Sequence, residues 1–309
     1  MNAPEISIVV PLYNEEKSFP LLIRRLSDLL GSIELHVQVV LVNDGSSDNT
    51  PYLMEMQSKK DPRFKSVFLS RNHGHQLAVS AGMHYTDAQN AIMIIDGDLQ
   101  DPPELLPEFY EKIREGFDVI YAVRKNRKEN VVIKFAYWSY YRLQKMVSNY
   151  NIPLDSGDFC MISKRVRDIM VAMPESSRYL RGMRSWVGFR QFAYAYDRVE
   201  RQAGKSKYSL KKLTELAFNG IFNFTSFPVR LMYRLGFLSI IFSMIYIVYL
   251  LILKFRGDVL PEGYVTLIFS ISFFSGVQLL CLGLIGEYVY RMYNQVRERP
   301  LFIVDKIIN

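Results

Sequence analysis

Cysteine is nearly absent from this chain of 309 residues, because only Cys160 and Cys281 occur and they lie far apart in the sequence. A disulfide framework or a thiolate metal site needs more cysteines at closer spacing, so neither is predicted. The beginning of the chain also lacks the basic leader and long apolar run of a signal peptide, since the run from Ile6 to Val10 is short and is broken by Pro11. We therefore expect the first part of the chain to stay in the cytoplasm.

Charge is missing from two long stretches near the carboxyl end. No charged residue occurs among the 19 residues from Leu235 to Leu253, or among the 24 residues from Gly263 to Gly286. At 1.5 Å per residue, each stretch is long enough to cross a hydrocarbon core of about 30 Å. The sequence therefore predicts two transmembrane helices, the alternative being a pair of buried helices in a large soluble core.

Basic residues flank these two stretches on their outer sides. Arg230 and Arg234 precede the first stretch and Arg291, Arg297 and Arg299 follow the second, whereas the intervening loop balances its charges. The positive-inside tendency then places both ends of the chain in the cytoplasm, as expected for a multi-pass protein of the cytoplasmic membrane. Glycines in the second stretch would also let copies of the chain pack into a homo-oligomer.

These differences in composition divide the chain into four parts. We expect a cytoplasmic catalytic domain at residues 1–209, an amphipathic juxtamembrane region at 210–229, a two-helix transmembrane hairpin at 230–290 and a cytoplasmic tail at 291–309. The formal net charge of +7 suits anionic substrates and an anionic membrane surface. It would also suit nucleic acid, but no zinc or stacked-aromatic nucleic-acid module is recognisable, so no nucleic-acid partner is predicted.

Short apolar runs rich in β-branched residues alternate with amphipathic stretches through the first 125 residues. This alternation predicts an α/β domain with a parallel sheet covered by helices. The expected strands are Ile6–Val10, Val37–Val42, Lys65–Leu69, Ala91–Ile95 and Val119–Ala122. Each is followed by polar residues, and ligands of open α/β sheets bind outside the carboxyl ends of the strands. We therefore expect the five strand ends to line one cleft.

The run from Asp96 to Glu104 is the strongest chemical signal at these strand ends. Asp96 and Asp98 directly follow the apolar run that ends at Ile95, where an unsolvated carboxylate is costly without a cation or ligand. Two aspartates separated by Gly97 can share Mg²⁺ or Mn²⁺, which usually completes its shell with substrate phosphate. A solvated turn is the alternative, since Asp-Gly-Asp is common in turns. The run predicts a divalent metal site and a nucleotide diphosphate.

Several ordered motifs resemble the family 2 inverting glycosyltransferases, which have the GT-A fold. The motifs are SIVVPLYNEE (Ser7–Glu16), VNDGSSDNT (Val42–Thr50), LSRNHGHQLAVSAG (Leu69–Gly82), DGDLQDPPE (Asp96–Glu104) and DSGDF (Asp155–Phe159). The run Gly204–Tyr208 and the two uncharged stretches are similar to the polyprenyl-phosphate branch, which includes bactoprenol glucosyltransferases and dolichol-phosphate mannose synthases. The resemblance implies a nucleotide-sugar-binding, Rossmann-like GT-A domain followed by two transmembrane helices.

The resemblance also implies a role for individual residues. It assigns nucleotide binding to Pro11, Tyr13, Asn14, Glu15, Asp44, Arg71 and Asp96. It assigns metal binding to Asp96, Asp98 and Gln100, and the catalytic carboxylate to Asp158, with Asp155 as a rival. The acceptor phosphate is assigned to the basic residues Arg124, Arg127, Arg201, Lys205 and Lys207. For His73 and His75 a zinc site is disfavoured because no cysteine or third histidine lies nearby, and a loop role near the donor is expected instead.

The resemblance implies metal-dependent, inverting transfer of one sugar from a nucleotide diphosphate sugar to a polyprenyl phosphate in the membrane. UDP-glucose and undecaprenyl phosphate are the expected substrates. GDP-mannose with dolichol phosphate, an aminosugar donor, and a hydroxyl acceptor remain open, as does an inactive membrane scaffold. Arg184-Ser185-Trp186 resembles part of the Gln-x-x-Arg-Trp motif of polysaccharide synthases, but Arg181 replaces the glutamine, which argues against a polymer-extruding enzyme.

Overall fold

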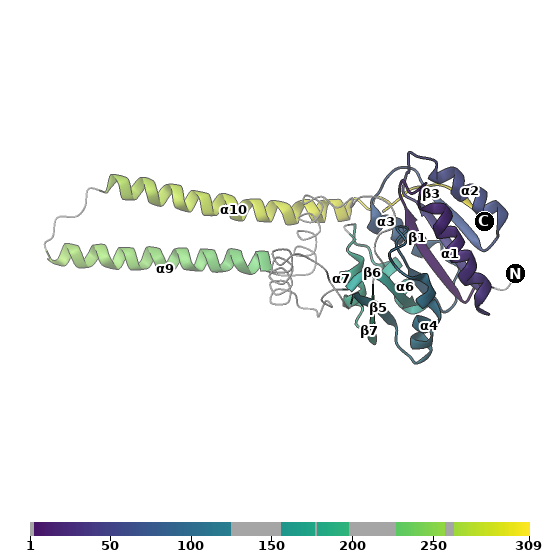
Figure 1. The fold of residues 1–309 in the computed structure, drawn as a ribbon. Helices are drawn as coiled ribbons and strands as arrows, with labels where there is room; N and C mark the ends of the chain where they lie inside the picture. Colours follow the sequence, from purple (N-terminus) through teal and green to yellow (C-terminus); the bar gives the residue numbers. More distant parts are fainter. Residues whose placement is uncertain (1–2, 125–155, 177, 198–226, 257–262) are drawn as a thin grey trace.

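The fold combines a sheet domain with a helical hairpin (Figure 1). The computed structural model describes residues 3–124, 156–176, 178–197, 227–256 and 263–309. The strands are β1 (Ile6–Leu12), β2 (Val37–Asn43), β3 (Phe64–Leu69), β4 (Ala91–Ile94), β5 (Val119–Arg124), β6 (Ser156–Ser163), β7 (Gln191–Tyr196) and β8 (Val304–Ile308). The helices are α1 (Phe19–Ser32), α2 (Thr50–Lys60), α3 (His75–His84), the 3₁₀ turn η1 (Pro103–Leu105), α4 (Leu106–Arg114), α6 (Lys164–Ala172), α7 (Leu180–Trp186), α9 (Phe227–Arg256) and α10 (Tyr264–Val296).

The sheet has eight strands in the order β7-β5-β6-β4-β1-β2-β3-β8. Strands β1 to β4 pair in parallel where they are neighbours, as the alternating pattern predicts. The expectation of a parallel sheet is wrong in one respect, because β6 runs antiparallel between β4 and β5, and β8 runs antiparallel beside β3. Both strands lie outside the strand–helix alternation of the first 125 residues, so that pattern does not predict them.

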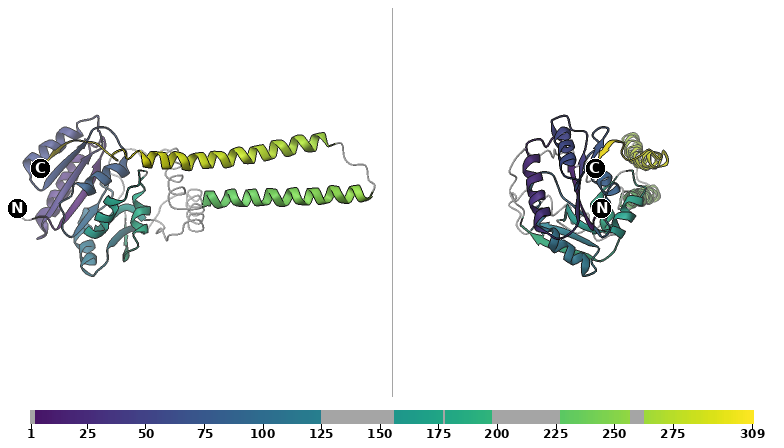
Figure 2. Two further views of the ribbon diagram at one scale, coloured as in Figure 1. Left: turned by 180° about the vertical axis from the view of Figure 1, so that it is seen from behind. Right: turned by 90° about the vertical axis from the view of Figure 1, so that its right-hand side faces the viewer.

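The core forms on both faces of the sheet. All seven residues of β1 are buried, as expected for a central strand that is covered on both sides. Ile6, Ile8 and Val10 pack with apolar residues of α1, while Val9, which points the other way, packs with α3. Helix α1 buries Leu22 among other apolar residues that repeat at helical spacing. Figure 2 shows α1 and α3 on opposite faces of the sheet.

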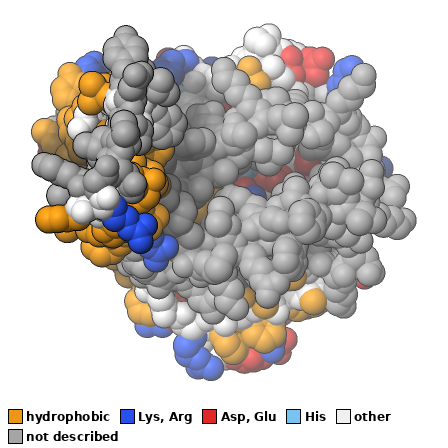
Figure 3. Space-filling model, turned by 90° about the vertical axis from the view of Figure 1, so that its left-hand side faces the viewer, with side chains coloured by type: hydrophobic (Ala, Val, Ile, Leu, Met, Phe, Trp, Pro, Cys, Tyr) orange, Lys and Arg blue, Asp and Glu red, His pale blue; other side chains and the backbone are white. Residues whose placement is uncertain are grey.

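Helices α9 and α10 lie side by side and extend away from the sheet domain (Figures 1 and 2). Viewed from the hairpin, their described side chains are mostly hydrophobic, and acidic side chains are visible near the middle of the face behind them (Figure 3). Within the described residues, one helical stretch, Phe273–Val296, is long and apolar enough to cross a membrane, and a shorter apolar one spans Arg234–Tyr246. One candidate span is therefore present, whereas the prediction of two is not confirmed.

The chain returns to the sheet after α10. The Ser70 N–H donates to the carbonyl of Ile303 (2.9 Å), and β8 then pairs with β3. At the end of α10, Gln295 Oε1 accepts from the backbone N–H of Ser176 (3.0 Å). The hairpin is thus held to the sheet domain at its carboxyl end, while the predicted division into four parts stays a prediction.

Candidate active site

The loops that follow β1 and β2 are hydrogen-bonded to each other. The backbone N–H of Asn14 donates to Ser46 Oγ (3.0 Å), and Asn14 Oδ1 accepts from the Ser47 N–H (2.8 Å). The Glu15 N–H donates to Thr50 Oγ1 (2.9 Å). Asn14 has a φ of 54°, a left-handed conformation that asparagine tolerates better than most residues. Asn14 and Glu15 therefore join the two loops, and their predicted contact with a nucleotide stays a prediction.

Asp44 connects the loop after β2 to the loop after β3. Its side chain is buried, and its two oxygens accept from the backbone N–H groups of His73 (2.7 Å) and Gly74 (3.0 Å). Burial raises the pKa of Asp44 above its usual value, although these hydrogen bonds act in the opposite direction. The loops approach so closely at Gly45, where φ is +65°, that a Cβ would lie 2.4 Å from the backbone of Arg71. Asp44 is thus a fixed part of the strand-end edge.

The acidic loop after β4 lies against the end of β1. A Cβ on Gly97 would come within 2.5 Å of Leu12 Cδ2 and 3.2 Å of the Pro11 carbonyl oxygen, so only glycine fits there without displacement. Asp96 and Asp98 on either side are half-buried, and Asp98 Oδ1 accepts from the Gln100 N–H (3.2 Å). The two aspartates therefore flank a glycine that lies against the end of β1, at the edge where we expect the nucleotide.

Two side chains hold the acidic loop from outside. Arg25 on α1 donates two hydrogen bonds to Glu104 (3.0 and 2.7 Å) and a third to the carbonyl of Leu99 (3.2 Å). On the other side, the buried Asp101 accepts from the hydroxyl of Tyr196 on β7 (3.0 Å). These contacts fix the shape of the loop without using Asp96 or Asp98.

The antiparallel strand β6 brings Asp158 to the acidic loop. In the β4–β6 register, Ile94 is opposite Cys160. Asp96 lies two residues beyond Ile94, and Asp158 lies two residues before Cys160, so the two aspartates emerge next to each other at the same edge. This placement follows from the reversed direction of β6, because a parallel β6 would put its first residues at the opposite edge of the sheet.

Asp158 is buried in a cluster of charged side chains. Its side chain is 9% exposed and accepts two hydrogen bonds from Arg181 on α7, from Nε (2.8 Å) and from NH2 (3.0 Å). His75 Nε2 lies 3.5 Å from Asp158 Oδ2 and 3.6 Å from Asp96 Oδ1. The His75 side chain is 31% exposed, but Nε2 itself is buried between the two carboxylates. One histidine therefore contacts both predicted functional aspartates.

The charges in this cluster stabilise one another. Burial lowers the pKa of His75, but the nearby carboxylates of Asp158 and Asp96 outweigh burial and raise that pKa to about 9. Burial raises the pKa of Asp158, but Arg181 and His75 outweigh it and hold the pKa well below its usual range. At neutral pH, His75 is therefore a cation and Asp158 is a carboxylate with little tendency to take up a proton.

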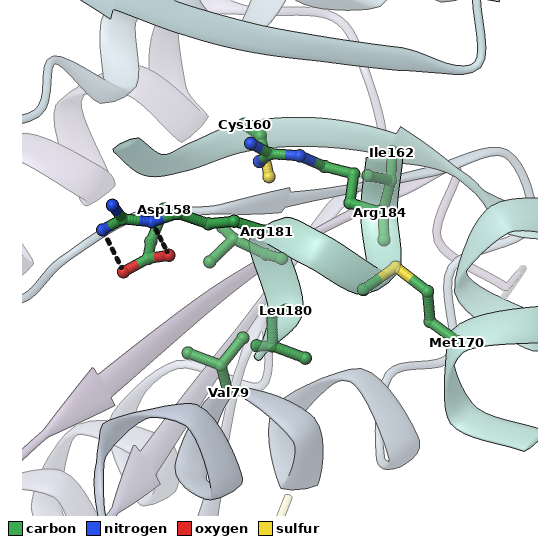
Figure 4. Close-up of a pocket in the computed structure, with 9 residues that line it drawn as sticks. Val79, Asp158, Cys160, Ile162, Met170, Leu180, Arg181 and Arg184 are labelled. Carbon is green, nitrogen blue, oxygen red and sulfur yellow. Dashed lines mark hydrogen bonds and ion pairs between the residues drawn. The ribbon is translucent and has the colours of Figure 1, made fainter. Parts of the chain in front are cut away.

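A small pocket lies behind Asp158 and contains a second arginine (Figure 4). Arg184 on α7 is 3% exposed, and its NH2 donates a long hydrogen bond to the carbonyl of Gly157 (3.4 Å). Its guanidinium lies beside Cys160, which is also buried (Figure 4). The pocket is lined by Val79, Ile94, Asp158, Cys160, Ile162, Met170, Leu180, Arg181 and Arg184. Arg184 therefore places a second positive charge beside Cys160, in the same pocket as the Asp158–Arg181 pair.

The residues of the acidic loop fit a divalent cation that is shared with a nucleotide. Asp96 and Asp98 provide hard oxygen ligands, and Gly97 between them lies against Pro11 and Leu12 at the end of β1. Within the described ranges, no group of three His, Cys, Asp or Glu side chains forms a complete metal cage. This agrees with Mg²⁺ or Mn²⁺, which usually takes only one or two carboxylates and relies on substrate phosphates for other ligands. The side-chain role of Gln100 stays a prediction.

The remaining predicted residues are distributed unevenly. Tyr13 is 40% exposed and Arg71 is exposed, both at the strand-end edge. Asp155 and four of the basic residues, Arg127, Arg201, Lys205 and Lys207, lie outside the described residues, and Arg124 is described only as the last backbone position of β5. The sequence predicted only a loop role near the donor for His75, and it assigned no role to Arg181. The only available signals were the motif around His75 and the three-residue spacing of Arg181 and Arg184, which places both on one face of α7.

Comparison with known proteins identifies the family. The family model for glycosyl transferase family 2 matches residues 7–169. The chain belongs to this family. The match includes the loops after β1, β2 and β4 as well as Asp158, so the α/β domain with its mixed sheet is a GT-A-like glycosyltransferase domain. The predicted family and enzyme class are thereby confirmed.

Relatives match nearly the whole length of the chain, and a solved structure matches part of it. The chain is 42% identical over 98% of its length to the uncharacterized glycosyltransferase YkcC of Bacillus subtilis, of which it covers 94%. It is 35% identical to the SfII prophage-derived bactoprenol glucosyl transferase of Shigella flexneri, over 98% of both proteins. Glucosyl-3-phosphoglycerate synthase from Mycobacterium tuberculosis, solved with Mn²⁺, UDP and glucosyl-3-phosphoglycerate, is 16% identical, with a TM-score of 0.45 over 70% of this chain and 76% of that one.

Proposed function

We propose that this glycosyltransferase transfers one sugar from a nucleotide diphosphate sugar to a polyprenyl phosphate at the cytoplasmic face of the membrane. UDP-glucose and undecaprenyl phosphate are the proposed substrates. The similarity to a bactoprenol glucosyl transferase over nearly the whole chain supports this proposal. The observation that carries it is the buried, ion-paired Asp158 next to the acidic loop.

The state of Asp158 favours a phosphate acceptor over a hydroxyl acceptor. A sugar or protein hydroxyl needs a base to remove its proton, and an aspartate whose pKa is held low by Arg181 is a weak base. A phosphate monoester has a second pKa of about 6, so its attacking oxygen is already largely ionised at neutral pH. Asp158 would then orient the acceptor instead of removing a proton from it. The neighbouring cations Arg181 and His75 would moderate the repulsion between the two anionic substrates.

We assign the donor to the loops after β1, β2 and β4. Asp44 holds two of the strand-end loops together, while Asp96 and Asp98 face the leaving diphosphate. Mg²⁺ or Mn²⁺ bound by these two carboxylates would stabilise the charge that develops on the leaving group. Attack of the acceptor from the opposite face of the sugar inverts the anomeric centre, so an α-linked donor gives a β-linked lipid product.

The hairpin of α9 and α10 supports a membrane acceptor. Its exposed apolar side chains include Phe237, Ile245 and Leu279, and some acidic side chains are visible from the hairpin side (Figure 3). We propose that both helices span the membrane, with both ends of the chain in the cytoplasm. The predicted phosphate-binding residues Arg201, Lys205 and Lys207 precede the hairpin in sequence, in keeping with a site near the membrane surface.

A substrate panel tests the proposed function. The purified full-length protein is incubated with Mn²⁺, undecaprenyl phosphate and labelled UDP- or GDP-sugars, and products are identified by mass. A glucosyl lipid phosphate formed from UDP-glucose is expected, with no product from Asp98→Asn and normal product from Asp28→Asn, whose side chain is 75% exposed on α1. A product from a GDP-sugar alone would contradict the assigned donor, and transfer only to a hydroxyl compound would contradict the assigned acceptor.

A further inference from the structure

His75 links two strands that carry the predicted functional carboxylates. Its Nε2 lies 3.6 Å from Asp96, which follows β4, and 3.5 Å from Asp158 on β6. Both distances are those of ion pairs and exceed the usual length of a hydrogen bond. Asp96 belongs to the donor side of the proposed site and Asp158 to the acceptor side. His75 therefore contacts both sides at once.

The residues next to His75 are fixed on both sides of the site. The N–H groups of His73 and Gly74, which enter α3, donate to the buried Asp44. On the other side, Gln76 Oε1 accepts from the N–H of Leu180 (2.9 Å), the first residue of α7. His75 is thus attached through its neighbours to the donor-side loops and to the helix that carries the arginine partner of Asp158.

We propose that His75 is a positioning residue that holds Asp158 at a fixed place relative to Asp96. This inference rests on the proposed function. His75 Nε2 lies against a carboxylate oxygen of each aspartate, and the bidentate contact of Arg181 is with Asp158, so replacing the imidazole changes what separates the two carboxylates. Without His75, the Asp158 carboxylate would lose this contact and leave the orientation that the acceptor needs. A misplacement of about 1 Å is enough to lower a rate about 100-fold.

A purely structural role for His75 makes a different prediction. As the first residue of α3, His75 could instead stabilise the start of that helix. Its replacement would then lower the thermal midpoint and reduce every activity of the enzyme to the same extent. It would not act through Asp158, so the effects of replacing both residues would multiply.

The experiment is a double-mutant cycle on UDP release from UDP-glucose with Mn²⁺, with and without undecaprenyl phosphate. His75→Leu is expected to lower the acceptor-dependent kcat about 100-fold while the KM for UDP-glucose changes less than about threefold. Adding His75→Leu to Asp158→Asn should cause little further loss. His75→Gln, which keeps an N–H donor without the charge, should lie in between. His84→Leu is the control, because His84 lies on the same helix and contacts Tyr85 and Phe302 instead.

The proposal is overturned if His75→Leu keeps kcat within about twofold of wild type, or if its effect multiplies with that of Asp158→Asn. Absence of acceptor-dependent UDP release in the wild type would refute the proposed function instead. The role of His75 is then tested without measuring activity, by comparing crystal structures of the wild type and of His75→Gln. The Asp158 carboxylate should move relative to Asp96 in the variant. An unmoved carboxylate would refute the positioning role even if transfer is observed.

Discussion

Two buried aspartates, at opposite ends of the strands of the sheet, each pair with an arginine. The surroundings of the two pairs differ. Asp118, just before β5, accepts from Nε and NH2 of Arg165 and from Ser163 Oγ (3.0 Å). Asp158, near the beginning of β6, accepts from Nε and NH2 of Arg181. The side chains of Asp118 and Asp158 are 5% and 9% exposed, so burial does not distinguish them.

What differs is the charge around each pair. The Arg165 side chain is 59% exposed and lies over the ring of Phe189 (4.3 Å). Its ion pair with Asp118 therefore reaches solvent on one side. Asp158 shares His75 with Asp96, so its pair is part of a larger cluster at the strand-end edge. The same bidentate contact can therefore serve stability at one edge of the sheet and a reaction site at the other.

The largest effect is expected at the acidic loop. Asp98→Asn should lower transfer about 10³-fold, because it removes a charge facing the leaving diphosphate. The thermal midpoint should stay close to that of wild type, since Asp98 is only half-buried. Initial rates and thermal melts check both, with Asp28→Asn as the matched control on the surface. Full activity in Asp98→Asn would show that this loop does not serve the donor.

Matched arginine substitutions test the comparison directly. Arg181→Met should lower kcat about 100-fold because Asp158 loses its orientation, and Arg181→Lys should restore only part of it because lysine cannot form the bidentate pair. Arg165→Met should leave kcat within about twofold of wild type and lower the thermal midpoint by a few degrees. Equal effects of Arg181→Met and Arg165→Met on kcat would remove the distinction between the two edges.

Acid should weaken the ion pair between Asp118 and Arg165. Burial raises the pKa of Asp118, but hydrogen bonds from Arg165 and Ser163 outweigh it and leave the pKa below its usual value. Ionised Asp118 therefore stabilises the fold above about pH 4, and this contribution is lost as the pH falls through the lowered pKa. Asp118→Asn should lower the thermal midpoint by roughly 2–4 °C at pH 7, with a gap to wild type that narrows toward pH 3. Calorimetry at several pH values measures the gap, and a gap independent of pH would contradict this account.

The smallest effect is expected at an exposed pair on the far side of the sheet. Lys306 on β8 contacts Glu55 on α2 (2.7 Å), and the pKa of Glu55 is lowered to about 2, chiefly by hydrogen bonds from Lys306 and Lys59. Solvent and salt screen such pairs, so Lys306→Ala should shift the thermal midpoint by about 1 °C or less. Melts at low and high salt provide the check. A large, salt-independent shift would show that β8 depends on this contact.

The sequence predicted the local parts of the site well. The five strands of the first 125 residues and their polar ends are present, because apolar periodicity and strand-end polarity are properties of neighbouring residues. Asp96 and Asp98 could be recognised in the same way. The predicted phosphate-binding residues, such as Arg201 and Lys207, lie outside the described residues and stay predictions.

The contacts around Asp158 could not be predicted in this way. Asp96 and Asp158 are adjacent only because β6 enters the sheet antiparallel beside β4, which no local pattern indicates. His75 and Arg181 each lie in the first turn of a helix, and neither has a periodic signal that reveals its partner. Their roles follow from distances between residues that are far apart in the chain.

The sequence by itself determined the family, the strand–helix alternation, the acidic loop and the apolar stretches, since each depends on which residues are neighbours in the chain. The tertiary structure alone decided that β8 forms one edge of the sheet, that β6 runs antiparallel, and that His75 lies between Asp96 and Asp158. The physical reason is that strand order and ion-pair geometry depend on how distant segments pack, and packing is a property of the whole chain.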